Sequence, residues 1–435
     1  MAAGDEKRLA GRKVAAVACF DSFAKMAMTL LSACRREGAD TTLHLLEISN
    51  RALSRRQLLE IRRIDRRVHI EKGTWDHFRH RVTPMAESVD VLVLGLDGQR
   101  SRDALLQLKS AWSKRTRRPL LVSAYPGILF RFALEGMLDR SGVDLLCLNS
   151  QTDLQTYQDG CQALGMSSRN AVVTGLPILW RVEPRRKHPD RPSIVFFEQP
   201  SIPVHPLQRR FICKQLKELA LFRPEHAVIF KPRTSSIEST LHRRHGEMAG
   251  VIGQMSERIP NLQLSFKPAT RLLRNCGCAI TVSSTAALEA MAMGVSTRVV
   301  GDLGVTETLG NHFFAGSGAV ADFEAIRHDP FTPKHHIDWL QSHGMVPDGQ
   351  DRFIRALMER LSQDTPGLPE QPHGPRSWGS EVWQGYALRH GGRRMLSSAG
   401  ARSSQRKRHR TRSLLRRIRD GLVGFSWFSK VLRER

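Results

Sequence analysis

Three consecutive hydroxyl residues, Ser283, Ser284 and Thr285, stand in the segment AITVSSTAALEAMAMG, which starts at Ala279. The apolar residues before them predict a strand, and the run after them predicts a helix that ends at Gly294. Hydroxyls at a helix N-terminus cap free backbone N–H groups, and the same end of a helix attracts phosphate. Because one hydroxyl is enough for capping, the triplet favours a phosphate-binding turn, with pure capping as the alternative.

Two further groups of polar residues directly follow predicted strands. Lys231 and Arg233, in the block FKPR, carry charges that could grip a phosphate or diphosphate, with Arg acting as a two-pronged donor. Gln199 and Ser201 follow the strand at 193–197 and could contact a ligand. The alternative for Lys231 and Arg233 is a basic pair on the surface. The alternative for Gln199 and Ser201 is an ordinary loop between a strand and a helix.

Length and composition indicate a globular protein of two domains with a large positive charge. The 435 residues exceed what one hydrophobic core usually needs. The net charge of +25 favours an anionic partner, namely nucleic acid, an acidic membrane surface or a phosphorylated ligand; a solvated Arg-rich surface is the alternative. Seven cysteines, mostly in apolar runs, are typical of a reduced cytosolic protein. No signal peptide and no run of 18 apolar residues is found.

Short apolar runs alternate with helical segments along most of the chain, which is the pattern of a parallel sheet covered on both faces. The first two predicted helices span 22–36 and 54–64. We therefore predict an α/β protein with two doubly wound, Rossmann-like domains that face a cleft. The predicted strands are 13–18, 41–46, 89–94, 120–124, 144–148 and 171–174 in the first domain, and 193–197, 226–230, 262–266, 279–282 and 297–300 in the second.

Composition changes along the chain predict the domain boundaries. The first domain spans 10–180, and a polar segment with three prolines separates it from a second domain at 193–362, which a helix near 352–361 is expected to close. Residues 363–400, which include a proline-rich stretch, form a flexible linker. Residues 401–435 form a basic amphipathic tail.

The tail combines dense positive charge with a cluster of apolar residues. From 402 to 435 it has twelve basic and two acidic residues. Apolar residues from Leu414 to Leu432 recur at spacings of three or four and would share one helix face, with Trp427 at its edge. This combination favours contact with an anionic membrane through residues 402–435 over binding of nucleic acid, and a disordered or partner-bound tail is the alternative.

Several short motifs of the second half carry a resemblance to a known family. They are the FKPR block with His242 downstream, the SSTAALEAMAMG run, and NHFFAGSG at 311–318. In this order they resemble a family of predicted glycosyltransferases of the GT-B type, distantly similar to bacterial sialyltransferases and capsule polysaccharide transferases. The resemblance covers about 10–320. Sialyltransferases have a His-Pro pair where this chain has Lys231, which speaks against a CMP-sugar donor and leaves another nucleotide-sugar possible.

The resemblance implies roles for several of these residues. In the related sialyltransferases an acidic residue followed by Gly in the first domain takes a proton from the acceptor hydroxyl. Asp97 is the nearest match and Asp21 is the rival; either could simply cap a helix. Glu289 could bind a ribose or be solvated. No Asp-x-Asp motif occurs, so we expect no metal, with Lys231, Arg233 and the turn at 283–285 stabilising the leaving phosphate.

The sequence thus predicts an enzyme, a metal-independent GT-B glycosyltransferase that needs no cofactor besides its nucleotide-sugar co-substrate. It would transfer a sugar to a cell-surface glycan or a lipid-linked acceptor, in the cytoplasm, peripherally on the inner face of the membrane. A nucleotide-sugar epimerase-like enzyme with the same two-domain architecture is one alternative. A non-catalytic nucleic-acid-binding protein, supported by charge alone, is the other.

Overall fold

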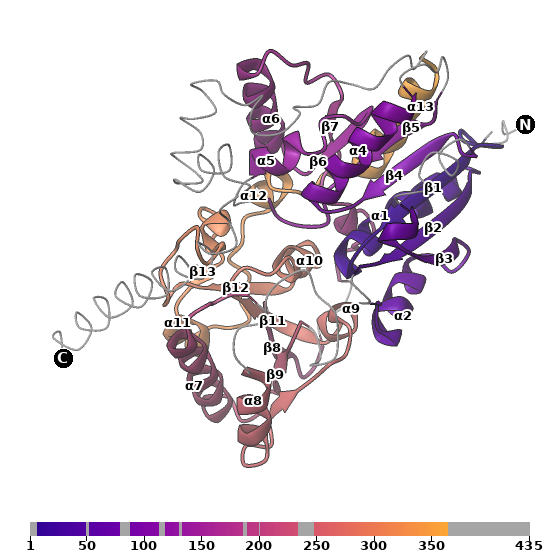
Figure 1. Cartoon of the computed structure of the whole chain (residues 1–435). Coiled ribbons are helices and arrows are strands. Elements are labelled where there is room, and N and C mark those ends of the chain that lie inside the picture. Colours follow the sequence, from indigo (N-terminus) through magenta and orange to yellow (C-terminus); the bar gives the residue numbers. More distant parts are fainter. Residues whose placement is uncertain are drawn as a thin grey trace, which may run out of the picture.

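Two parallel sheets, each covered by helices, form the two domains of the protein (Figure 1). The computed structural model describes residues 7–48, 52–78, 88–112, 118–129, 133–185, 189–199, 201–233 and 248–363. The predicted α/β class with two Rossmann-like domains is confirmed. His242, residues 364–400 and the basic tail lie outside the described residues.

The first sheet has seven strands in the order β3-β2-β1-β4-β5-β6-β7, and all of its neighbouring strands run parallel. Its strands are apolar and buried in the middle of the sheet, as a sheet covered on both faces requires. They are β1 (Lys13–Ala18), β2 (Asp40–Glu47), β3 (His69–Thr74), β4 (Val91–Gly95), β5 (Leu120–Ser123), β6 (Leu145–Leu148) and β7 (Ala171–Val173).

The second sheet has six parallel strands in the order β10-β9-β8-β11-β12-β13. The buried rings of Phe196 and Phe230 stack in its core at a centroid distance of 5.6 Å. The strands are β8 (Ser193–Phe197), β9 (Val228–Lys231), β10 (Leu262–Leu264), β11 (Cys276–Thr281), β12 (Ser296–Val300) and β13 (Val320–Ala321).

Helices connect the strands and cover both faces of each sheet (Figure 1). Helix α2 begins with a capping box, in which the Ser54 hydroxyl accepts the Gln57 N–H and the Gln57 side chain accepts the Ser54 N–H. The helices are α1 (Asp21–Arg36), α2 (Arg55–Ile64), α4 (Gly98–Trp112), α5 (Ala133–Leu138), α6 (Gln151–Ala163), α7 (Pro206–Phe222), α8 (Met248–Ser256), α9 (Ala269–Leu273), α10 (Ala286–Ala292), α11 (Phe323–His328), α12 (Ile337–Ser342) and α13 (Gly349–Leu361), with 3₁₀ helices η1 (Pro177–Leu179) and η2 (Asn311–Phe314).

The last described helix, α13, belongs to the first domain, whereas the sequence predicted that it would close the second. Its buried residues Phe353, Ile354 and Leu357 join the apolar cluster that α1, β1 and β4 form in the first domain. The helix begins against the carbonyl of Thr174, where a Cβ on Gly349 would stand 2.0 Å from that oxygen. The apolar face of α13 therefore completes the first core, and the chain crosses between the domains twice.

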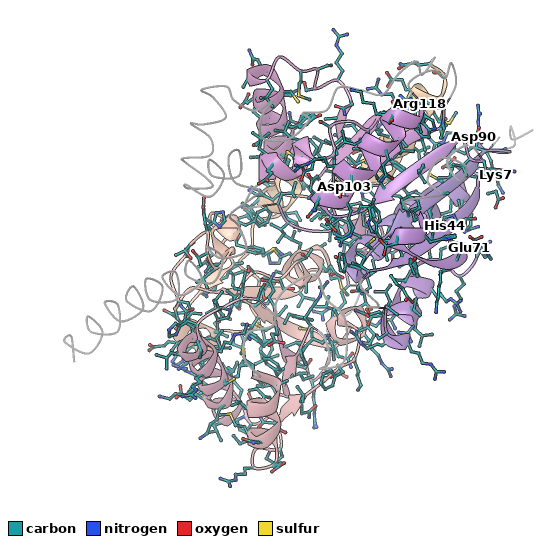
Figure 2. All side chains as sticks on the ribbon, in the orientation of Figure 1. Lys7, His44, Glu71, Asp90, Asp103 and Arg118 are labelled. Atoms are coloured by element: carbon teal, nitrogen blue, oxygen red, sulfur yellow. The ribbon has the colours of Figure 1, made fainter. Side chains whose placement is uncertain are left out.

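The carboxyl ends of the first sheet's strands point toward the second domain. Lys7, Asp90 and Arg118 precede β1, β4 and β5, and Figure 2 shows all three at the edge of the first domain that lies away from the second. In doubly wound proteins ligands bind beyond the carboxyl ends of the strands. The cleft between the domains is thus the place where a ligand is expected.

Two short strands were not predicted from the sequence. Strand β3 is the edge of the first sheet, and its segment HIEKGT is largely exposed and polar. Strand β13 has only two residues at the edge of the second sheet. An edge strand packs against one neighbour only, so it needs no continuous apolar run and leaves no such signal in the sequence.

Candidate functional site

The polar residues singled out in the sequence gather at two corresponding points of the two sheets. The strand order reverses between β1 and β4 in the first sheet and between β8 and β11 in the second. Asp21 and Asp97 follow β1 and β4, whereas Gln199 and the hydroxyl triplet follow β8 and β11. Such reversal points leave a crevice in which α/β proteins bind their ligands.

Two hydroxyls of the triplet brace the turn itself. The Ser283 hydroxyl donates to Oε1 of Gln199 at 2.9 Å, and the Gln199 amide donates back to the Ser283 carbonyl at 2.5 Å. The Ser284 hydroxyl accepts the Ala286 N–H at 3.3 Å, and the Ser284 N–H donates to the Thr281 hydroxyl. Gln199 and Ser283 therefore hold the loops after β8 and β11 together, and Ser284 caps the start of α10.

Thr285 lies where the two domains meet. Its hydroxyl oxygen would be 3.1 Å from a Cβ placed on Gly127 of the first domain, so only a glycine fits there without displacement. Ser201 is half-buried in the turn between β8 and α7. The predicted phosphate contact of the triplet and the predicted ligand contact of Ser201 remain predictions.

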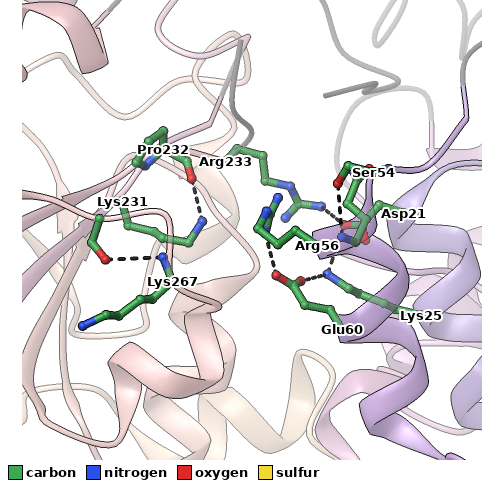
Figure 3. Close-up of polar contacts among 11 residues, drawn as sticks. Asp21, Lys25, Ser54, Arg56, Glu60, Lys231, Pro232, Arg233 and Lys267 are labelled. Carbon is green, nitrogen blue, oxygen red and sulfur yellow. Dashed lines mark hydrogen bonds and ion pairs between the residues drawn. The ribbon is translucent and has the colours of Figure 1, made fainter. Parts of the chain in front are cut away.

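Lys231 and Arg233 leave the end of β9 toward α1 and α2 of the first domain (Figure 3). Lys231 is only 7 % exposed, and its Nζ donates to the Pro232 carbonyl at 2.6 Å. Burial, together with the neighbouring charges of Arg56 and Arg233, lowers the pKa of Lys231 to about 8. A bound anion would compensate these crowded positive charges.

A network of charged side chains spans the cleft at this point (Figure 3). Arg233 of the second domain lies 3.8 Å from the Asp21 carboxylate of the first. Lys25 links Asp21, at 3.1 Å, to Glu60, at 2.5 Å, and Arg56 also contacts Glu60 at 2.5 Å. The network therefore connects Asp21, the predicted base, to Arg233, which is predicted to bind phosphate.

Sequence reasoning missed three members of this network, namely Lys25 on α1 and Arg56 and Glu60 on α2. The spacing of four residues between Arg56 and Glu60 is visible in the sequence, but it is also the ordinary spacing of an exposed ion pair on a helix. Only the position of α2 beside the second domain shows that the pair faces a cleft.

Asp21 has the environment of a functional carboxylate. It follows Phe20, whose φ of 64° is rare for a residue with a side chain and costs roughly 1–3 kcal/mol. Its side chain is 14 % exposed, and its buried Oδ1 has no hydrogen-bond partner among the residues that the structure describes. Oδ2 of the carboxylate is thus held by Lys25 and Arg233, while Oδ1 is buried and accepts no hydrogen bond from the described residues.

The carboxylate of Asp97, the other predicted base, is bound by Arg100, which lies close to it in the chain. Its Oδ1 accepts the Arg100 N–H at 3.2 Å, and its Oδ2 pairs with the Arg100 guanidinium at 2.5 Å. Because Arg100 lies in the first turn of α4, Asp97 acts as a helix cap with a charged partner. The geometry favours Asp21 over Asp97 as the residue that faces the second domain.

Glu289 lies on α10 at the inner wall of the cleft and is 8 % exposed. Burial raises its pKa to about 7, and the positive charges of Lys25 and Arg233 partly oppose this rise. A carboxyl group with this pKa is about half protonated at neutral pH, so it can both donate and accept hydrogen bonds. This property suits a pair of sugar hydroxyls.

Two expected absences concern the part of the chain that the structure describes. There, no group of three or more His, Cys, Asp or Glu side chains is arranged to hold a metal ion. None of the helices among the same residues combines the length and the apolar character that crossing a bilayer requires. Metal independence stays a prediction.

The arrangement as a whole can bind an anion and move a proton. Lys231 and Arg233 supply positive charge from one domain, and Asp21 supplies a carboxylate from the other. Glu289 can recognise hydroxyl groups beside them. These are the parts that a displacement at a phosphorylated substrate requires.

Comparison with known proteins agrees with this architecture. Residues 14–360 match a protein family described as "Putative glycosyltransferase (DUF6716)". No curated protein matches the chain.

Solved structures of two-domain enzymes have a similar fold. UDP-GlcNAc 2-epimerase from Neisseria meningitidis, bound to UDP-GlcNAc, aligns with a TM-score of 0.54 at 11 % identity and covers 80 % of this chain and 100 % of its own. A protein from S. aureus, solved with UDP, aligns with a TM-score of 0.53 at 10 % identity and covers 82 % and 99 %. At such low identity the likeness concerns the fold alone.

Proposed function

Because this chain belongs to the glycosyltransferase family that it matches over residues 14–360, we propose that it transfers a sugar from a nucleotide-sugar donor to an acceptor hydroxyl. The observation that carries the proposal is the contact between Arg233 of the second domain and Asp21 of the first. It brings a phosphate-binding cation and a proton acceptor to the same point of the cleft.

The second domain would bind the donor. Lys231 and Arg233 are the charged groups for its diphosphate, and the turn at 283–285 would add a further phosphate contact. Glu289 would hydrogen-bond the ribose hydroxyls. Two proteins of similar fold were solved with UDP-GlcNAc and with UDP, which supports a nucleotide diphosphate as the group to be bound.

In the proposed reaction the acceptor oxygen attacks the anomeric carbon of the donor sugar. Asp21 takes the proton of the attacking hydroxyl, and the bond between the anomeric carbon and the phosphate oxygen breaks. The nucleotide leaves with its negative charge stabilised by Lys231 and Arg233. Since the diphosphate would compete with Asp21 for Arg233, donor binding would release the carboxylate at the moment when it is needed.

Metal independence, the class of acceptor and the location of the enzyme are further features of the proposal. The reaction would need no metal, because two cations already face the site of the leaving group. The acceptor would be a cell-surface glycan or a lipid-linked molecule. Residues 402–435 would hold the enzyme peripherally on the inner, anionic face of the membrane.

Product analysis separates this proposal from an epimerase. An epimerase would change the configuration of a nucleotide-sugar without an acceptor, whereas a transferase would release the nucleotide. The shared fold does not distinguish the two activities. Membership in a glycosyltransferase family favours both enzymes over a non-catalytic nucleic-acid-binding protein.

A thermal-shift panel of the full chain with CMP, CDP, UDP, GDP and their sugar conjugates tests the proposal. We expect one nucleoside diphosphate and its conjugate to raise the melting temperature by about 2–4 °C at a concentration near 100 times Kd. The stabilising conjugate is then incubated with the protein and followed by NMR. Absence of any shift across the panel contradicts the proposal, and an epimerised nucleotide-sugar in place of released nucleotide supports the alternative enzyme.

As the pH rises, donor binding should begin to weaken at a lower pH than it would at a site with an ordinary lysine. With the pKa of Lys231 at about 8, the amine is charged at pH 7 and largely neutral at pH 9. If the bound diphosphate keeps the amine protonated, the Kd should rise about tenfold between these pH values. Calorimetric titration at both pH values measures this rise. The Lys231→Met variant should bind more weakly and lose this part of the pH dependence, and an unchanged pH profile would contradict the role of Lys231.

A further inference from the structure

A cavity of about 480 Å³ opens between the two domains beside the charged network. One wall is helix α2 of the first domain, and the other is the loop from β10 to α9 of the second. A volume of this size is sufficient for a small ligand. The lining residues are Arg56, Leu59, Glu60, Arg63, Leu264, Ser265, Phe266, Lys267 and Pro268.

The charges of the cavity favour an anion. Three of its lining residues, Arg56, Arg63 and Lys267, are cationic, whereas Glu60 is the single carboxylate. Glu60 is already bound by Lys25 and by Arg56 at 2.5 Å each. The positive charges of Arg63 and Lys267, from opposite walls, are therefore left for a ligand.

The same cavity has an apolar surface. Leu59 from α2 is 56 % exposed and Phe266 from the opposite wall is 43 % exposed, although both are large apolar residues. Leu264 and Pro268 add to this surface. Exposed apolar side chains that face one another across a cavity mark a binding surface for an apolar group.

The cavity shares two of its lining residues, Arg56 and Glu60, with the charged network at the proposed reaction site. Arg56 lines the cavity, and its charge acts on Lys231 at the end of β9. Glu60, also in the lining, belongs to the network that reaches Asp21 through Lys25 (Figure 3). A ligand in the cavity would thus have one end near the carboxylate that takes the acceptor's proton.

We infer that this cavity binds the acceptor, and that the acceptor carries a phosphate group next to an apolar chain. Arg63 and Lys267 would hold the phosphate, and Leu59 and Phe266 would contact the start of the chain. The inference rests on the proposed function and narrows its acceptor to the lipid-linked class. A neutral glycan would leave both the charge and the apolar surface of the cavity unused.

The test is calorimetric titration of the full chain with octyl phosphate, inorganic phosphate and 1-octanol. We expect octyl phosphate to bind at least about tenfold more tightly than either of the other probes, since it engages both surfaces. The double variant Arg63→Gln, Lys267→Gln should lose this preference, and Phe266→Ser should reduce it. The matched control Arg62→Gln, Lys217→Gln removes the same charge from α2 and the second domain at exposed residues outside the cavity lining.

Three results would overturn the inference. Equal binding of octyl phosphate by both double variants would show that the tail or the general charge attracts the ligand. Equal affinity for octyl phosphate and inorganic phosphate would assign the cavity to a free anion. Tighter binding of 1-octanol than of octyl phosphate would exclude an anionic ligand.

The nucleotide panel keeps the two proposals apart. Nucleotide binding by the wild-type protein, together with equal octyl phosphate binding by the two double variants, refutes the cavity and leaves the transferase proposal standing. Octyl phosphate binding that depends on Arg63 and Lys267, in a protein that binds no nucleotide, supports an amphiphile site and refutes the transferase proposal.

Discussion

The Asp21→Asn variant is expected to lose about 10²–10⁴-fold of its sugar-transfer rate, the usual contribution of a general base. The amide has the shape of the carboxylate but cannot accept the proton of the acceptor hydroxyl. Oδ2 of Asp21 contacts Arg233 across the cleft, and Oδ1 has no hydrogen-bond partner among the described residues, so we expect this loss at the reaction centre. The measurement is the initial rate of nucleotide release from the stabilising donor with water as the acceptor, because water supplies the O–H proton that Asp21 would take.

The effect should appear in kcat, with little change in donor affinity. Asp21 is a neighbour of Arg233 and would repel the donor's phosphates slightly, so the neutral variant should bind the nucleotide as tightly as the wild type or more tightly. An interaction lost only in the transition state lowers kcat and kcat/KM together. A variant that loses nucleotide binding to the same extent as rate would contradict the role of a base.

Asp97→Asn is the matched control. The replacement keeps an oxygen that can accept the Arg100 N–H, although it removes the ion pair with the guanidinium. We therefore expect a modest loss of stability, about 0.5–2 kcal/mol at most, and a nearly unchanged rate. If Asp97→Asn lost the rate and Asp21→Asn kept it, the assignment of the two carboxylates would have to be reversed.

The Arg233→Gln variant is expected to bind the nucleoside diphosphate about 10–100-fold more weakly than the wild type. A hydrogen bond to a charged group contributes about 1.5–3 kcal/mol, and each 1.4 kcal/mol is a factor of ten in Kd. The guanidinium is 42 % exposed, and among the described residues its only ion-pair partner is Asp21 at 3.8 Å, so it is available to a ligand. Calorimetric titration with the nucleotide found in the panel gives the two Kd values.

Arg210→Gln provides the control for charge alone. Arg210 is exposed on α7, which lies on the side of the second domain away from the first (Figure 1). Both variants lower the net charge by one, but only Arg233 is positioned at the cleft. Equal Kd values for Arg233→Gln and Arg210→Gln would mean that the donor's phosphates are not held by Arg233.

The doubly wound architecture was largely predictable from the sequence. Central strands such as β1, β4 and β8 are buried on both faces, and each therefore consists of an uninterrupted apolar run. The first predicted strand coincides with β1 at Lys13–Ala18. Edge strand β3 was missed because its residues are mostly exposed and polar, so it contains no apolar run.

Helix α13 shows where sequence order misleads. It follows the second domain in the chain, and nothing in its amphipathic pattern tells which sheet its apolar face will cover. The structure packs Phe353 and Leu357 into the core of the first domain. The sequence of an amphipathic helix shows that one face is buried, but the tertiary structure decides which element packs against that face.

The candidate site was likewise predictable from the sequence only in part. Residue type and position after a strand were enough to single out Asp21, Lys231, Arg233 and Glu289, because the carboxyl ends of parallel strands collect at one edge of each sheet. The sequence could not rank Asp21 above Asp97. Both follow central strands, and only the packing shows that Arg100 occupies one while the other faces Arg233.

By itself the sequence determined the central strands, the two similar halves, the excess of positive charge and the residues at the strand ends. The tertiary structure alone decided which charges from the two domains meet. Arg56 and Glu60 look like an ordinary surface pair until α2 is placed beside the loop after β10. The physical reason is that backbone patterns arise from neighbours in the chain, whereas the potential and shape of a cleft arise from side chains that are far apart in the chain and close in space.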